Sequence, residues 1–174
     1  MKLASHAVAL ALLVAKSLCA HAQDGPLTGA QVVGVVIVAN RSDVAVGELA
    51  LRRTQSRSVQ NFARRLVAEH GDAERRAAAM LAQFGAQARA SAMSDALANQ
   101  ARGDLDTLDE LGSRDFDLAY VRREIVWHER WIAATDDIIR STTNPHVKAL
   151  LAAARPTCIL HLNQARTLEW ALSR

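Results

Sequence analysis

The sequence predicts an all-α protein whose mature part is an antiparallel, up-down four-helix bundle with one extra short helix. Half of the 174 residues are hydrophobic but only 4% are aromatic, so alanine, leucine and valine supply most of the apolar surface. Alanine and leucine favour helix, and 3 prolines with 8 glycines are too few for the many turns of an all-β chain. Long segments also repeat apolar residues at three- and four-residue spacing, which is typical of amphipathic helices.

The N-terminus has the pattern of a secretory signal peptide. Lys2 begins a short positive region, residues 7–15 are apolar, and Ala20-His21-Ala22 offers small residues where a signal peptidase cleaves. We therefore expect residues 1–22 to be removed. Residues 23–29 are then a short linker, and residues 30–174 form a single domain.

The cysteines and the charge limit what the mature chain can be. Cys19 leaves with the leader, and Leu18 before it does not fit a lipoprotein signal, so Cys158 remains alone as a buried small hydrophobe. The formal charge of +3 includes two leader lysines, and removing the leader brings it to about +1. Charges of both signs are interspersed, which excludes a nucleic-acid-binding surface. No transmembrane span is expected in the mature chain.

The first two long helices are expected on either side of a short turn. Thr28 caps the first. The β-branched run at residues 32–38 resembles a buried strand, but the apolar pattern continues helically through Leu51, so we interpret it as helix. Ser56 caps the second helix, which ends near Gly85.

The shorter helix is expected to carry the chain across to the second pair of long helices. A loop over residues 86–93 precedes it, and Ser94 caps it. The third long helix covers about residues 114–139. After a turn at residues 141–145, the last helix begins, with a kink expected at Pro156.

Polar side chains on faces that should be apolar form the candidate site. Projected at about 100° per residue, every long helix places at least one carboxylate or histidine on its inner stripe, whereas Asp43 points the other way. The inward set comprises His128, His161, His70, Glu48, Glu124 and Asp117. Buried carboxylates are costly unless they are paired or bind a metal.

Two interpretations of this set remain open at the level of the sequence. Imidazoles and carboxylates suit a divalent transition metal such as copper, zinc or iron, with His128 and His161 the surest ligands because they lie at the same height above the last turn. The alternative is a structural network of buried polar groups that fixes the helix register. In that case Glu48, Asp117 and Glu124 pair with arginines such as Arg41, Arg122 or Arg123, or lie nearer solvent than the helical wheel indicates.

The chain resembles a bacterial family known as domain of unknown function 4142. The resemblance covers about residues 32–172. It rests on VGELA at 46–50, VQNFA at 59–63, LVAEH at 66–70, FDLAYV at 116–121 with His128, and Pro156 before His161-Leu162. It implies a ferritin-like bundle and export to the periplasm or the outer membrane, but no established activity. We expect the periplasm, with outer-membrane association as the alternative.

The spacing departs from that of ferritin-like di-iron sites, which use Glu-x-x-His motifs. Here the glutamates precede the histidines by one residue (Glu69-His70) or by four (Glu124 and His128), and His161 has a cysteine at the three-residue spacing. We therefore expect a histidine-rich, mononuclear site. Metal storage, buffering or stress protection is the first functional hypothesis. A non-catalytic envelope protein and a metal-dependent redox enzyme are the alternatives.

Overall fold

The computed structural model describes residues 26–174, except for the side chain of residue 114, and shows five α-helices and no strand within that range. The predicted leader lies outside the described residues. The helices are α1 (Gly29–Arg53), α2 (Arg57–Gln83), α3 (Ala92–Asp109), α4 (Ser113–Ser141) and α5 (Pro145–Leu172). Among the described residues, no helix combines the length and the hydrophobicity that a membrane span needs. The all-α prediction is confirmed.

Polar caps begin most of the helices, as the sequence predicts. The Thr28 side chain accepts from the Gln31 amide, the Ser56 side chain accepts from the Val59 amide, and Asn144 caps α5 just before Pro145. These side chains satisfy backbone N–H groups that have no partner within the helix.

The start of α3 differs from the prediction. The predicted cap Ser94 is the third residue of the helix, and Ser91 is the N-cap. The two serines form a reciprocal capping box, in which each hydroxyl accepts from the other's backbone amide. Both residues carry the same signal in the sequence, so the pattern located the helix end within one turn.

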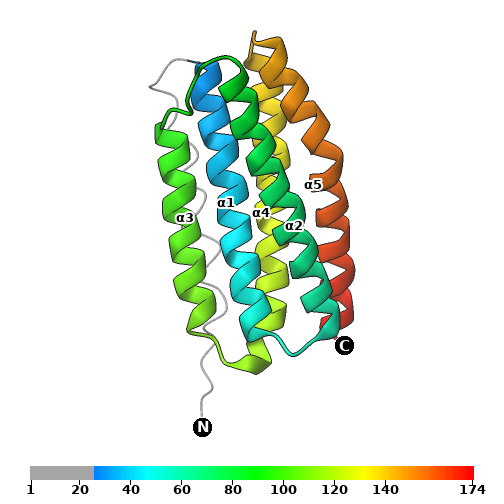
Figure 1. The fold of residues 1–174 in the computed structure, drawn as a ribbon. Helices are drawn as coiled ribbons and strands as arrows, with labels where there is room; N and C mark the ends of the chain where they lie inside the picture. Colours follow the sequence, from blue (N-terminus) through cyan, green and yellow to red (C-terminus); the bar gives the residue numbers. More distant parts are fainter. Residues whose placement is uncertain (1–25) are drawn as a thin grey trace.

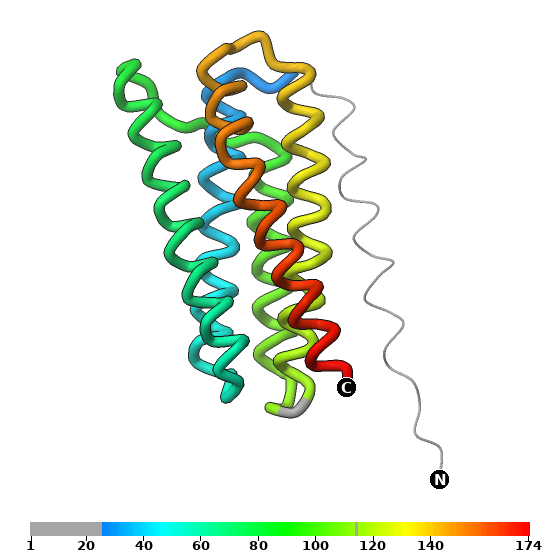
Figure 2. Tube along the Cα trace, turned by 90° about the vertical axis from the view of Figure 1, so that its right-hand side faces the viewer, coloured from blue at the N-terminus to red at the C-terminus, as the bar shows by residue number. Residues whose placement is uncertain are grey.

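The helices lie side by side with their axes roughly aligned (Figure 1). Helix α1 packs against α2, and α4 packs against α5, each pair joined by a short turn and therefore antiparallel. Helix α3 lies along the outer side of α1 (Figure 1). Seen from the side, α4 and α5 lie next to each other over most of their length (Figure 2).

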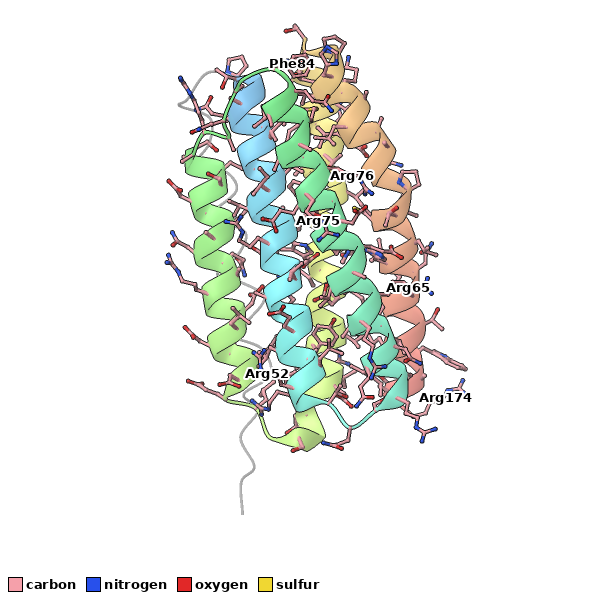
Figure 3. All side chains as sticks on the ribbon, in the orientation of Figure 1. Arg52, Arg65, Arg75, Arg76, Phe84 and Arg174 are labelled. Atoms are coloured by element: carbon pink, nitrogen blue, oxygen red, sulfur yellow. The ribbon has the colours of Figure 1, made fainter. Side chains whose placement is uncertain are left out.

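Helix α1 is buried around almost its whole circumference, because α2, α3, α4 and α5 all contact it. This burial explains its β-branched, apolar start, since a helix buried on all sides needs no polar face. The connection from α2 to α3 passes close to its first turns, where the Arg89 amide donates to Ala30 O over 3.1 Å (Figure 1). Surface arginines such as Arg52, Arg65, Arg75 and Arg76 project outward instead (Figure 3).

The hydrophobic core is divided into two halves along the bundle. The half around the start of α1, called the upper half, contains Val32–Val36, Trp127, Trp131 and Cys158. The half around the end of α1, called the lower half, is built on other apolar residues. Its members include Val46, Leu66, Phe116, Tyr120 and Ala165. The buried Asn40 and Asp43 of α1, His70 of α2, Glu124 of α4 and His161 of α5 have sequence positions between these two halves, and His128 of α4 directly follows Trp127 at their boundary. A polar layer therefore crosses the middle of the bundle.

Candidate metal centre

Three histidines from three helices meet in the polar layer. His70 on α2 is 5% exposed, and His128 on α4 and His161 on α5 are completely buried. Their ring centroids lie 5.0–5.5 Å apart, so the rings form a nearly equilateral triangle. One ring nitrogen from each histidine lies within 4.8 Å of the other two. This separation fits three ligands around one ion.

The outer nitrogen of His70 is held by an asparagine on α1. Asn40 Nδ2 donates to Val36 O over 2.7 Å, which turns the amide oxygen toward the histidine. His70 Nδ1 lies 2.8 Å from this oxygen, and since the oxygen only accepts, Nδ1 must carry the proton. The Nε2 atom of His70 therefore presents a free lone pair to the interior.

The other two histidines are oriented by the same logic. His128 Nδ1 donates to the backbone oxygen of Glu124 over 2.9 Å. His161 Nε2 donates to Glu69 Oε2 over 2.8 Å. Both partners can only accept, so the proton is on the outer nitrogen in each case. His128 Nε2 and His161 Nδ1 are buried and have no hydrogen-bond partner among residues 26–174.

A carboxylate from α1 completes the set. Asp43 is fully buried, and its Oδ2 atom lies 3.2 Å from His70 Nε2 and 3.8 Å from His128 Nε2. Neither Oδ2 nor these two nitrogens has a hydrogen-bond partner in the described part of the chain. Acceptor atoms thus face one another in a buried interior, where a shared cation, an added proton or another donor is needed to offset their desolvation cost.

Protonation of the histidines does not supply those protons at neutral pH. Burial lowers the pKa of His128 to about 4. Burial is also the main reason why the pKa values of His70 and His161 lie below the ordinary histidine value. The three rings are therefore neutral in the metal-free protein at neutral pH. The neutral imidazole is the form of histidine that binds metals.

A second polar group adjoins the histidines. Asp43, Glu124 and His128 each offer a ligand atom, and these atoms also lie within 4.8 Å of one another. Arg123 joins the two carboxylates, with Nη1 2.6 Å from Asp43 Oδ1 and 3.0 Å from Glu124 Oε1. Its Nε donates to Asp104 of α3 over 2.8 Å. This group ties α1, α3 and α4 together.

The two buried carboxyl groups differ in charge. Burial opposes ionisation of Asp43, but its electrostatic interactions with His70 and with the charged Arg123 outweigh burial, and the pKa of Asp43 lies below its usual value. Burial, and then the neighbouring Asp43 charge, raise the pKa of Glu124 to about 8. The pair thus carries one proton at neutral pH, and Glu124 holds it.

The sequence matches the family model for a domain of unknown function (DUF4142) over residues 16–168. The chain belongs to the DUF4142 family. The match confirms the resemblance and covers most of the chain. No curated protein and no solved structure matches this sequence.

In this DUF4142 chain the structure brings four of the six predicted site residues together. His70, His128, His161 and Glu124 all lie in the two groups described above. Glu48 does not, because its side chain is exposed, and its predicted inward orientation is wrong.

Asp117 shares the inner face of α4 but lies at a different height. It is half-buried and stands seven residues before Glu124, about 10 Å along the helix axis at 1.5 Å per residue. The ring layers of Phe116 and Tyr120 in the lower core surround its level. Asp117 is therefore too far away to join the histidines.

The main correction concerns Asp43, which is predicted to point outward but is buried. A helical wheel assigns one inner stripe to a helix, but α1 is buried on both sides, so the residues opposite its first stripe are also interior. Asp43 lies three residues after Asn40, and the two polar groups share one face. A close Asn/Asp pair in an otherwise apolar helix is the signal that would have identified them.

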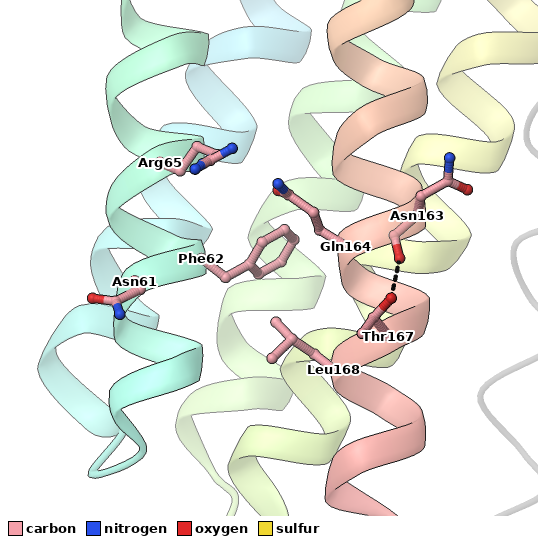
Figure 4. A pocket seen from close by; sticks show the side chains of 7 residues that line it. All are labelled: Asn61, Phe62, Arg65, Asn163, Gln164, Thr167 and Leu168. Carbon is pink, nitrogen blue, oxygen red and sulfur yellow. Dashed lines mark hydrogen bonds between the residues drawn. The ribbon is translucent and has the colours of Figure 1, made fainter.

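A groove on the surface of the bundle lies outside the centre. It measures about 400 Å³ and separates α2 from α5 (Figure 4). Phe62 and Leu168 form its apolar part, Arg65 and Gln164 lie at its polar edge, and Thr167 donates to the backbone oxygen of Asn163 over 3.0 Å (Figure 4). No residue of the histidine triangle lines it.

Proposed function

We propose that this protein binds one divalent transition-metal ion inside the bundle, with His70, His128, His161 and Asp43 as ligands. One observation supports this most strongly. Each histidine uses its outer nitrogen in a hydrogen bond and keeps the other nitrogen buried and unpaired, and one ring nitrogen of each histidine lies within 4.8 Å of the other two. Hydrogen bonds to the outer nitrogens of metal-ligating histidines orient the rings and increase their basicity.

A purely structural polar network accounts less well for these contacts. In such a network donors meet acceptors, as Arg123 meets Asp43 and Glu124. At the triangle, acceptor faces acceptor: the Asp43 oxygen and the histidine nitrogens are buried and unpaired within residues 26–174. Because the pKa values of the histidines are lowered, the network cannot repair itself with protons at neutral pH. A divalent cation would satisfy the unpaired histidine nitrogens, and Asp43 Oδ2, which lies beside two of them, would balance its charge.

The donor set narrows the choice of metal. Three neutral imidazoles and a carboxylate suit zinc, iron or copper, whereas magnesium and calcium favour oxygen ligands. Cys158 belongs to the upper hydrophobic core and to neither ligand group. The centre is therefore not a thiolate site. Storage, buffering or protection against metal stress is the function that such a closed, fully buried site supports best.

Fold and location belong to the same proposal. Helices α1, α2, α4 and α5 would form a ferritin-like four-helix bundle, with α3 as the long crossover between α2 and α4. A metal-buffering role fits an exported, periplasmic protein that starts at Gln23 after cleavage of residues 1–22. The intact mass of protein recovered from the periplasm tests this, and a lipidated species that retains Cys19 would contradict it.

Titration calorimetry and thermal melts with zinc, copper and ferrous iron test metal binding on untagged protein. We expect wild type to bind one ion with a dissociation constant below micromolar. The His128→Ala, His161→Ala double variant should lose about 100-fold or more in affinity, because two of four ligands are gone. The matched control is His146→Ala, since His146 is exposed and should not affect binding. Wild-type binding that persists in the double variant would reject the proposal.

A further inference from the structure

Arg123 occupies an unusual position beside the proposed centre. Its side chain is only 9% exposed and contacts three carboxylates, from α1, α3 and α4. Its guanidinium carbon also lies 4.7 Å from the centre of the Trp127 ring, so the group is stacked as well as hydrogen-bonded. A guanidinium held in this way through Nε, Nη1 and its stacked face has little freedom to move, and it does not lose its charge in proteins.

The position of this guanidinium coincides with a possible second metal position. Asp43, Glu124 and His128 present ligand atoms within 4.8 Å of one another, as a metal site requires. Arg123 Nη1 already lies within hydrogen-bond distance of two of these three residues. The charge that a second cation would supply is thus provided by the chain itself.

Arg123 also determines which oxygen of Asp43 remains free. Nη1 bonds Oδ1 over 2.6 Å, while Oδ2 faces the histidines. Asp43 can therefore offer the metal a single oxygen, and the guanidinium blocks a bridging arrangement in which its two oxygens bind two ions. A fixed positive charge next to the site adds repulsion against any further cation.

We propose that Arg123 is a built-in cation that restricts the centre to one metal ion. This inference rests on the proposed metal binding and assigns Arg123 a positioning and stoichiometry-determining role. Replacing the guanidinium with a neutral side chain would open Asp43 Oδ1 and Glu124 to a second ion. The centre would then hold two ions bridged by the two oxygens of Asp43, the second of them also bound by Glu124.

The test measures bound zinc per chain by equilibrium dialysis and elemental analysis on the full-length mature protein. We expect one zinc ion per chain for wild type, even in excess zinc, and two for Arg123→Gln. Arg123→Lys keeps a cation in place and should bind one. Arg122→Gln is the matched control, because neighbouring Arg122 is exposed and pairs with Glu169 at the surface. It should also bind one.

The outcomes separate this inference from the metal proposal. Wild type that binds no zinc rejects the metal centre itself. If wild type and Arg123→Gln both bind one ion, only the role of Arg123 is rejected. The same conclusion follows if wild type binds two ions and His128→Ala removes both sites. If Arg123→Gln does not fold without metal, it is refolded with zinc. Recovery with two ions per chain supports the inference, and recovery with one, or no recovery, overturns it.

Discussion

Glu124 illustrates how one buried side chain makes the whole protein sensitive to pH. Burial and the Asp43 charge raise its pKa from 4.5 to about 8, so between these values the folded chain holds a proton that the unfolded chain releases. The resulting stabilisation is complete below about pH 4.5 and is lost as the pH rises toward 8. His128 acts in the opposite sense below about pH 6.5, because its pKa is lowered to about 4.

The three buried histidines also titrate in the unfolded chain near pH 6.5, so the Glu124 contribution is the difference between wild type and a Glu124→Gln variant. Between pH 6.5 and 8 we expect the metal-free wild type to lose roughly 1–2 kcal/mol more unfolding free energy than Glu124→Gln, which has no proton to release. Urea unfolding in the presence of a chelator measures both. Glu48→Gln serves as the control, since Glu48 is exposed. Equal pH dependence in wild type and Glu124→Gln would show that Glu124 ionises normally.

Cys158 gives a second prediction at the residue scale. The thiol is 6% exposed, and burial raises its pKa to about 12. Because the thiolate is the reactive form, a disulfide-forming thiol reagent should modify native protein at least roughly 100-fold more slowly than protein in denaturant. Absorbance of the released thiol product follows both rates. Rapid labelling of the native protein would mean that α5 turns this face outward.

At the scale of helices, the sequence predicts which face of an amphipathic helix is buried, but it does not orient a helix that is buried on all sides. The amphipathic pattern of α2 placed His70 correctly, and those of α4 and α5 placed His128 and His161. Helix α1 has no polar face to orient the wheel, so Glu48 and Asp43 were assigned to the wrong sides. The pairing of Arg123 with Asp43 and Asp104 escaped prediction for another reason: these two acids lie on α1 and α3, and no local spacing reveals which helices are neighbours.

Gly34 on α1 shows the same dependence on neighbours and can be tested. A Cβ atom there would lie 2.2 Å from the backbone oxygen of Arg89, in the connection between α2 and α3. Gly34→Ala must therefore displace this connection and weaken the bond from the Arg89 amide to Ala30 O. We expect a loss of about 1–3 kcal/mol, as is typical of overpacking, measured by urea unfolding.

The control for this prediction is a glycine in the same protein with room for a side chain. Gly103 lies within α3, and a Cβ atom there would meet nothing within 4 Å. Gly103→Ala should stabilise the protein by roughly 0.5–1 kcal/mol, because alanine loses less backbone freedom on helix formation. If Gly34→Ala stabilised the protein to the same extent, the close packing of the connection on α1 would be wrong.

At the scale of the whole molecule, the polar layer separates two hydrophobic halves, and its unpaired acceptors carry a desolvation cost at this level of the bundle. The four proposed ligands come from α1, α2, α4 and α5, one from each. An ion bound to all four would join both helical hairpins at mid-height. Ligand binding stabilises the folded state by about 2.7 kcal/mol at a free concentration 100 times the dissociation constant.

Hydrogen exchange detected by mass spectrometry distinguishes this four-helix connection from a site on one hairpin. With zinc bound, we expect slower exchange in the peptides around Asp43, His70, His128 and His161, because local opening of any of these helices would break a metal bond. Peptides of α3, which supplies no ligand, should change least. The His128→Ala, His161→Ala double variant should show no zinc-dependent change. Protection confined to α4 and α5 would mean that Asp43 and His70 do not bind the ion, and that metal does not connect the two hairpins.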